Sequence, residues 1–290
     1  MSSQLHNSFR LVAIAVILST SAFAGVPMEY DLSAVRVVQY EYRFREYFGP
    51  DLDQLEDSGR RMDFQLLIRF EAEGKVVIEA SSLRLVPAPP EGWIGDLDFE
   101  RFSKITCTIT AVMDASGRLE NVSEPKADAV VANGEPSALE LKGIRSFIWP
   151  YLCRSVELAL VRLPPIERGP GQSWRCEPRD WGCDLPKSDK LFPFELLQVV
   201  DVQDERKVRI IGGPVQDLPP VRAEPLPPQG IHGLPFSRRQ YDVQLDFDVQ
   251  EQSITHGQIT KTYERNSGDI KMPPRPIYVA KQIHEVNVVR

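Results

Sequence analysis

The stretch QYDVQLDFDVQ, residues 240–250, alternates apolar and polar side chains from end to end. The apolar positions Tyr241, Val243, Leu245, Phe247 and Val249 share one parity. Because successive side chains of a β-strand point to opposite faces, this pattern predicts a strand with one face on a core and the other in water. Such one-sided strands are typical of antiparallel sheets.

The same period of two recurs along most of the chain. Further strands are predicted at residues 38–44, 62–70, 75–85, 105–113, 192–202, 207–211, 254–263 and 277–288. The apolar parity changes between Ala80 and Leu83, which predicts a β-bulge. Turn-like connections such as 71–74 and 114–117 favour successive hairpins, so the strands should form an extended antiparallel meander. A sheet of this size must curve around something to bury its apolar face.

The segment that fills the sheet is predicted at residues 135–160. Pro136 suits the first turn of a helix, and apolar residues from Leu139 to Ile148 recur at helical spacing. Pro150 should end or kink this helix, because a proline inside a helix loses one hydrogen bond and clashes with the preceding turn. The predicted fold is therefore mainly β (α+β): a large curved antiparallel sheet, an incomplete barrel, wrapped over a broken helix.

One region departs from the strand pattern. Residues 214–235 contain seven prolines, which prevents pairing as a central strand and favours an extended, polyproline-like conformation. The segment could be a linker between domains, but the strands after it are too few to stand alone. We therefore expect one β-rich domain over residues 25–290, with a proline-rich surface excursion at 214–235.

The first residues have the composition of a secretory signal peptide. Arg10 precedes the apolar run Leu11–Ile17, and Ala22-Phe23-Ala24 resembles a cleavage site. The run is far shorter than the roughly 20 apolar residues that span a bilayer. We therefore expect a signal peptide at 1–24, no membrane anchor after its cleavage, and a protein exported to the periplasm or the extracellular space.

The charge balance excludes one class of partner. The chain has 34 Lys and Arg against 41 Asp and Glu, a formal net charge of −7, and no basic cluster. An acidic surface of this kind repels the phosphates of nucleic acids. We therefore expect no nucleic-acid partner.

The four cysteines are Cys107, Cys153, Cys176 and Cys183. An even number in an exported protein favours disulfides, with three possible pairings. Cys176 and Cys183 are separated by six residues rich in turn formers, and Cys107 and Cys153 are both expected to face the core. We therefore expect Cys176–Cys183 and Cys107–Cys153. A zinc or redox site would require close pairs such as C-x2-C, which the chain lacks.

The sequence offers no catalytic, cofactor-binding or metal-binding motif. Its histidines are distant from one another, and it has neither a G-x-S-x-G elbow nor a phosphate-binding loop. Aromatic residues on the apolar parity of the strands are the remaining candidates, because they could line a cavity for an apolar ligand. These candidates are Tyr40, Tyr42, Phe44, Phe64, Phe70 and Phe247. Ordinary packing of a core predicts the same residues and is the favoured interpretation.

Two short motifs in the middle third of the chain point to a family. Asp114, Gly117 and Leu119 form a D-x-x-G-x-L turn upstream of the helix. An LP…G-x-S-W loop follows the helix and comprises Leu163, Pro164, Gly171, Ser173 and Trp174. This arrangement resembles bacterial secreted proteins of unknown function, whose architecture is similar to the half-barrels of periplasmic lipoprotein carriers. The resemblance implies a curved sheet that encloses an acyl chain, and it transfers no catalytic residue.

The sequence thus favours an exported, non-enzymatic protein that binds an apolar small molecule or another exported protein, with no cofactor. The alternative is a secreted hydrolase with paired carboxylates, which would require two Asp or Glu side chains held together and partly buried.

Overall fold

The computed structural model describes residues 25–50, 52–86, 101–131, 134–176, 196–203, 207–213, 236–266 and 276–289. The predicted signal peptide at 1–24, the proline-rich segment at 214–235 and Cys183 lie outside the described residues.

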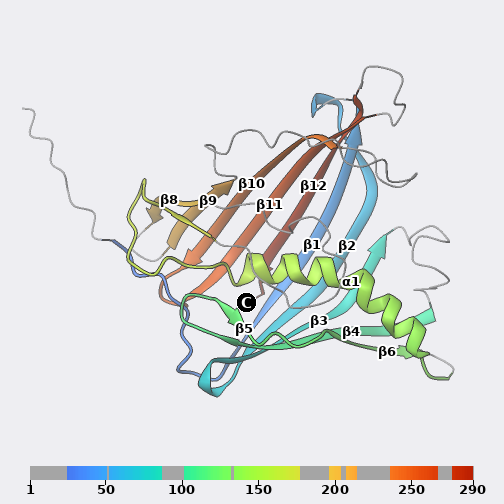
Figure 1. Ribbon diagram of the computed structural model, residues 1–290, viewed down its shortest axis with the longest axis horizontal. Helices are drawn as coiled ribbons and strands as arrows, with labels where there is room; N and C mark the ends of the chain where they lie inside the picture. The colour runs from blue at the N-terminus through green and yellow to red at the C-terminus, as the bar shows by residue number, and fades with distance from the viewer. Residues whose placement is uncertain are drawn as a thin grey trace, which may run out of the picture.

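In the described part of the chain, twelve strands form one antiparallel sheet (Figure 1). They are β1 (Arg36–Gly49), β2 (Glu56–Phe70), β3 (Lys75–Val86), β4 (Phe102–Met113), β5 (Leu119–Glu120), β6 (Lys126–Val131), β7 (Ser173–Arg175), β8 (Leu196–Gln203), β9 (Lys207–Gly213), β10 (Phe236–Asp248), β11 (Ser253–Asn266) and β12 (Pro276–Val288). The strand order is β5-β4-β3-β2-β1-β12-β11-β10-β9-β8-β7, and β6 also pairs with β4. The sheet is open, and the first and last long strands, β1 and β12, pair at its centre.

The long strands confirm the sequence pattern. Each overlaps a predicted strand, and the bulge predicted in β3 appears as a register shift opposite Asp63 and Gln65, with Ser82 at φ 55°. Glu73 and Gly74, also at positive φ, turn the chain between β2 and β3. The short strand β5 completes the hairpin predicted at 114–117. The strands β6 and β7 were not predicted, because β7 has three residues and the apolar positions of β6 begin with two alanines, which give a weak alternation.

The helix α1 (Ala138–Ala159) begins with a capping box. The Ser137 side chain accepts a hydrogen bond from the Glu140 amide, and the Glu140 carboxylate accepts one from the Ser137 amide. Pro136 therefore precedes the N-cap instead of occupying the first turn. These two reciprocal bonds satisfy donors that the start of a helix otherwise leaves open.

The helix is continuous through Pro150, so of the two expected outcomes, an end or a kink, the structure has the kink. Figure 1 shows that α1 bends near its middle. A proline removes only one backbone hydrogen bond, and the next turns are held by packing, since every residue from Leu152 to Ala159 is buried. Among the described residues, no helix is both long and apolar enough to cross a membrane.

The core lies between the concave face of the sheet and α1. Figure 1 shows α1 crossing in front of the curved sheet, and its strand neighbours are β6, β11 and β12. Inward-facing residues of β1 to β4 and β8 to β11 supply most of the buried apolar side chains. The predicted fold class is confirmed, with one bent helix in place of a broken one.

Candidate functional site: the concave face and its end loops

The six aromatic candidates all lie in the buried core. Tyr40, Tyr42, Phe44, Phe64, Phe70 and Phe247 have exposed fractions between 0% and 5%. Tyr42 stacks on Phe64 with ring centroids 4.4 Å apart, and Phe247 meets Tyr30 edge-on at 6.0 Å. In this structure the aromatic face is therefore a filled core with α1 in place, as ordinary packing predicts.

Part of the concave face is covered by aromatic residues of α1. Tyr151 contacts Phe44 of β1 with centroids 5.3 Å apart, and Phe147 lies 5.9 Å from Tyr151. The pKa of Tyr151 is raised, mainly because burial disfavours the charged form. These contacts place the middle of α1 directly over β1.

A row of polar side chains crosses the concave face beside these aromatics. Glu46 of β1 is opposite Gln282 of β12, which in turn is opposite Lys261 of β11. Glu46 and Lys261 are buried, with exposed fractions of 2% and 6%. The Glu46 carboxylate accepts hydrogen bonds from Arg60 Nη1 at 3.0 Å and Gln282 Nε2 at 2.7 Å. Buried charges require such partners, because leaving water is costly for an ion.

His284 lies in the adjacent row of the same face, opposite Phe44 of β1. Its Nδ1 is hydrogen-bonded to the Tyr42 hydroxyl at 2.6 Å, and its ring lies 4.9 Å from the Phe44 ring. The side chain is 2% exposed. Burial holds the pKa of His284 well below its usual value, and the positive charges of Arg154 and Lys261 lower it further. His284 is therefore a neutral imidazole in a positive environment.

The C-terminal half of α1 adds charged groups over this polar region. Arg154 and Glu157 are 8% and 6% exposed and lie three residues apart, which places them near one another on a helix. Arg154 acts electrostatically on both Tyr42 and His284, so its side chain lies toward the sheet. The concave face thus has an apolar part and a polar part, both covered by α1.

The two motifs of the sequence come together at one end of the sheet. We call residues 26–32, 114–119 and 160–168 the end loops. The Leu163 amide donates to the Ser116 carbonyl at 2.8 Å, and the Tyr30 amide donates to the Ala115 carbonyl at 2.8 Å. Trp174 Nε1 donates to the Arg162 carbonyl at 3.0 Å. The motif residues therefore fix the path of the chain on both sides of α1.

Gly117 shows why this turn requires glycine. Its φ is 83°, and a side chain there would meet the Tyr30 ring and the Val161 carbonyl at 2.7 Å. Asp114 stabilises the same turn, because its Oδ1 accepts hydrogen bonds from the amides of Ser116 and Arg118, both at 2.9 Å. The D-x-x-G pattern is explained by the turn geometry.

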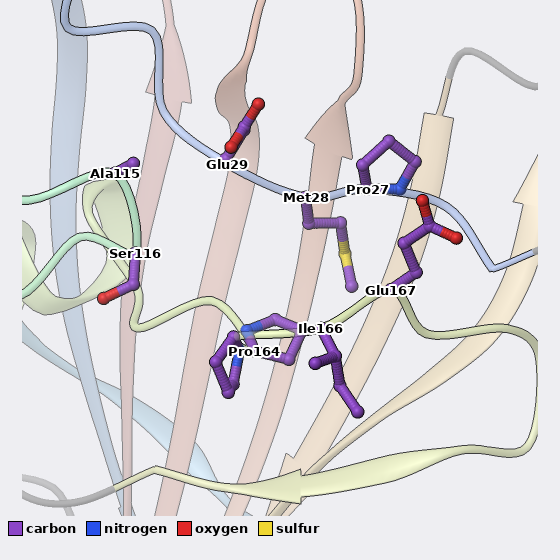
Figure 2. Close-up of a pocket in the computed structure, with 9 residues that line it drawn as sticks. Pro27, Met28, Glu29, Ala115, Ser116, Pro164, Ile166 and Glu167 are labelled. Carbon is purple, nitrogen blue, oxygen red and sulfur yellow. The ribbon is translucent and has the colours of Figure 1, made fainter.

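The end loops also line a pocket of about 640 Å³ (Figure 2). Its lining residues are Pro27, Met28, Glu29, Ala115, Ser116, Pro164, Pro165, Ile166 and Glu167. Figure 2 shows Met28 projecting from the N-terminal segment toward the 164–167 segment. The two carboxylates of this pocket, Glu29 and Glu167, belong to exposed residues. Sequence reasoning missed the pocket, because its three segments are distant in sequence and lack a shared pattern.

The expected disulfide between Cys107 and Cys153 is not formed. Cys107 lies on β4 and Cys153 on α1, and both are buried. A disulfide requires Cα atoms about 4.4–6.8 Å apart, and burial in one core does not by itself bring two residues that close. Burial raises the pKa of Cys107 to about 12. Cys176 donates its thiol to the Arg162 carbonyl at 3.3 Å, and its expected partner Cys183 lies outside the described residues.

The described residues contain no group of three or more His, Cys, Asp or Glu side chains that could hold a metal ion. The buried carboxylate of Glu46 is engaged by Arg60 and Gln282. This geometry gives no support to the paired-carboxylate hydrolase.

Comparison with known proteins yields a similarity of fold. No family model matches the chain, and no curated protein matches it. A solved structure of lipovitellin, described by its lipid–protein interactions, is similar with a TM-score of 0.52 and 8% sequence identity. The match covers 90% of this chain and 26% of the lipovitellin chain, so this protein spans about a quarter of its length. At this identity the similarity concerns the fold alone.

Proposed function

We propose that this chain is an exported protein that binds an apolar ligand, a lipid acyl chain, on the concave face of its sheet. The main observation in support of the proposal is that a helix covers the concave face of the sheet. One helix, α1, lies over an open sheet whose buried inner face is rich in large aromatic and aliphatic side chains. Movement of this helix would open an apolar surface, where binding is driven by removal of apolar area from water.

Export rests on the composition of residues 1–24, which has the charged start, short apolar run and small-residue site of a signal peptide. The fold similarity to lipovitellin supports the same function, since that protein is described by its interactions with lipid. The half-barrel architecture that the two sequence motifs imply points in the same direction.

The ends of α1 are suited to different roles in such a movement. Leu139 in its first turn is 79% exposed, whereas every residue from Leu152 to Ala159 is buried. A bend at a proline separates the two halves and gives a position where the helix can change direction. We expect the buried half to be displaced when a ligand occupies the concave face.

A reversible disulfide between α1 and the sheet tests this proposal. The Leu158 Cβ lies 3.3 Å from the position that a Cβ would occupy at Gly257 of β11. Bonded cysteines have Cβ atoms about 3.5–4.5 Å apart, so the double variant Leu158→Cys/Gly257→Cys should form a bond after a small shift. Binding of a fluorescent fatty acid is then measured before and after reduction, with peptide mapping to confirm the bond.

We expect the reduced double variant to bind the fluorescent fatty acid and the oxidised form to bind at least about tenfold more weakly, with recovery on reduction. The single variants Leu158→Cys and Gly257→Cys are matched controls, and their affinity should not depend on the redox state. Equal affinity of the oxidised and reduced double variant would contradict a movement of α1. Absence of binding by the wild-type protein would refute the proposed function itself.

A further inference from the structure

The Nε2 atom of His284 is buried and has no hydrogen-bond partner among the described residues. Its other ring nitrogen is occupied by the Tyr42 hydroxyl at 2.6 Å. Nearly all buried polar groups in proteins are hydrogen-bonded, so such an atom calls for an explanation. The aromatic rings of Phe44 and Tyr151 lie 4.9 Å and 6.4 Å from the imidazole, which fixes the ring without satisfying Nε2.

The groups around His284 make this part of the face attractive to negative charge. Lys261 is a diagonal neighbour on β11, since its partner Gln282 lies two residues from His284 along β12. Both Lys261 and Arg154 act on the imidazole as positive charges. Two acidic residues lie in the same region. The Glu46 carboxylate is hydrogen-bonded to Arg60 and Gln282. Glu157 lies on α1 one turn after Arg154.

We infer that His284 and Lys261 bind the head group of the ligand, and that this head group is anionic: the carboxylate of a long-chain fatty acid. The inference rests on the proposed function and names its ligand class. His284 Nε2–H donates to one carboxylate oxygen when the Tyr42 hydroxyl donates to Nδ1, and the Lys261 ammonium lies beside the other oxygen. The aromatic face of β1 and β2 next to this site accommodates the acyl chain.

This assignment explains why polar residues interrupt an apolar face. Replacing Lys261 or His284 by an aliphatic residue would avoid the cost of burying a polar group, so their presence favours a specific recognition role. Charge-assisted hydrogen bonds are roughly twice as strong as neutral ones, especially away from water. An alcohol of equal chain length fills the same apolar surface without providing the charge.

The test compares three ligands with the same tail: hexadecanoic acid, 1-hexadecanol and hexadecyl phosphate. Each displaces a fluorescent fatty acid from the full exported protein, and the dissociation constants are compared. The variant His284→Phe keeps a planar ring and removes Nε2. The matched control is His256→Phe, because His256 is a histidine of β11 whose Nδ1 is bonded to Asn287 at 2.8 Å, outside the proposed site.

We expect the wild-type protein to bind the acid at least about tenfold more tightly than the alcohol. His284→Phe should remove this preference by weakening only the acid, and His256→Phe should retain it. A phosphate that binds more tightly than the carboxylate would overturn the fatty-acid assignment and identify a phospholipid head group. Equal binding of acid and alcohol, or equal weakening of both by His284→Phe, would overturn the head-group site while leaving the proposed function intact.

A second measurement does not depend on the stability of the variant. In wild-type protein labelled with 15N at histidine, both ligands should shift the Nε2 signal of His284 when they displace α1. Hexadecanoic acid should shift it further than 1-hexadecanol, because only the carboxylate accepts a charge-assisted hydrogen bond from Nε2–H. Equal shifts with the two bound ligands would overturn the inference. If neither ligand displaces the fluorescent fatty acid, the proposed function and this inference both fail.

Discussion

The concave face has two parts, which differ in the polarity of their inward-facing side chains. Inward-facing residues of β2, β3 and β4 are apolar, from Phe64 and Leu66 to Ile78 and Ile109. On β1, β12 and β11 the same face holds Glu46, Gln282, His284 and Lys261. In the apolar part, the buried face of the sheet is apolar, as expected for a sheet with one face in water. In the polar part, the buried face carries polar and charged groups, and each of these groups requires a partner. Sites where local preference and fold disagree are often functional.

The largest expected effect lies in the apolar part. Phe64→Ala removes a ring that is 2% exposed and stacked on Tyr42, so the free energy of unfolding should fall by about 3–5 kcal/mol. Urea denaturation measures this loss. Val112→Ala, at a side chain that is 40% exposed, is the control and should change stability by less than about 0.5 kcal/mol. Similar losses in both variants would show that the apolar part is not tightly packed.

A smaller effect is expected where the two parts meet. Tyr42→Phe keeps the ring that stacks on Phe64 and removes the hydroxyl that is bonded to His284 Nδ1. A buried nitrogen left without its partner costs about 1–3 kcal/mol, so the variant should be destabilised by that amount. Tyr40→Phe is a useful control, because Tyr40 is equally buried on the same strand but has no assigned contact to His284. If Tyr42→Phe is no worse than Tyr40→Phe, the hydrogen bond contributes nothing to stability.

The pH dependence of the free energy of unfolding distinguishes the polar part, which contains the titratable His284, from the apolar part. The pKa of His284 is lowered well below 6.5 by burial, so the unfolded chain binds a proton there before the folded chain does. Stability should therefore be complete above pH about 6.5 and fall by about 1.4 kcal/mol for each pH unit below it, until the folded-state pKa is reached.

Urea denaturation at pH 7.5 and 5.5 measures this difference. His284→Phe should reduce the pH dependence, whereas Phe64→Ala should lower stability equally at both pH values. A pH dependence that is the same in the wild type and in His284→Phe would show that other groups cause it.

The sequence predicted the apolar part far better than the polar part. Strict alternation was sufficient to place Phe64, Leu66 and the β3 bulge, because a one-residue slip would expose the whole face. In β11, Lys261 has the same parity as the inward-facing Ile259. In β1, Glu46 has the same parity as Tyr42 and Phe44. The sequence pattern therefore indicated that these two polar residues face inward.

For β12 no such signal exists. Both parities of PIYVAKQIHEVNV contain apolar and polar residues, so the inward position of His284 depends on its pairing with β1 and β11. The end loops were predicted only as two motifs, since their contact is made by backbone hydrogen bonds between segments distant in sequence. The prediction of a Cys107–Cys153 bond was wrong, because burial of both residues says nothing about the distance between β4 and α1 at these positions.

The smallest expected effect concerns Cys107, which lies in the apolar part with an exposed fraction of 0%. Thiolates are the species that react with iodoacetamide, and burial raises the pKa of Cys107 to about 12, so the native protein should show almost no modification there at pH 8. Mass spectrometry of digested protein measures the labelling, and the same treatment in urea is the control in which Cys107 should react fully. Addition of hexadecanoic acid should leave Cys107 protected, because a ligand that displaces α1 would replace one apolar cover of this part by another. If the ligand increases the labelling of Cys107, the displacement of α1 exposes β4. In that case the apolar part, as well as the polar part, becomes accessible to water when α1 moves.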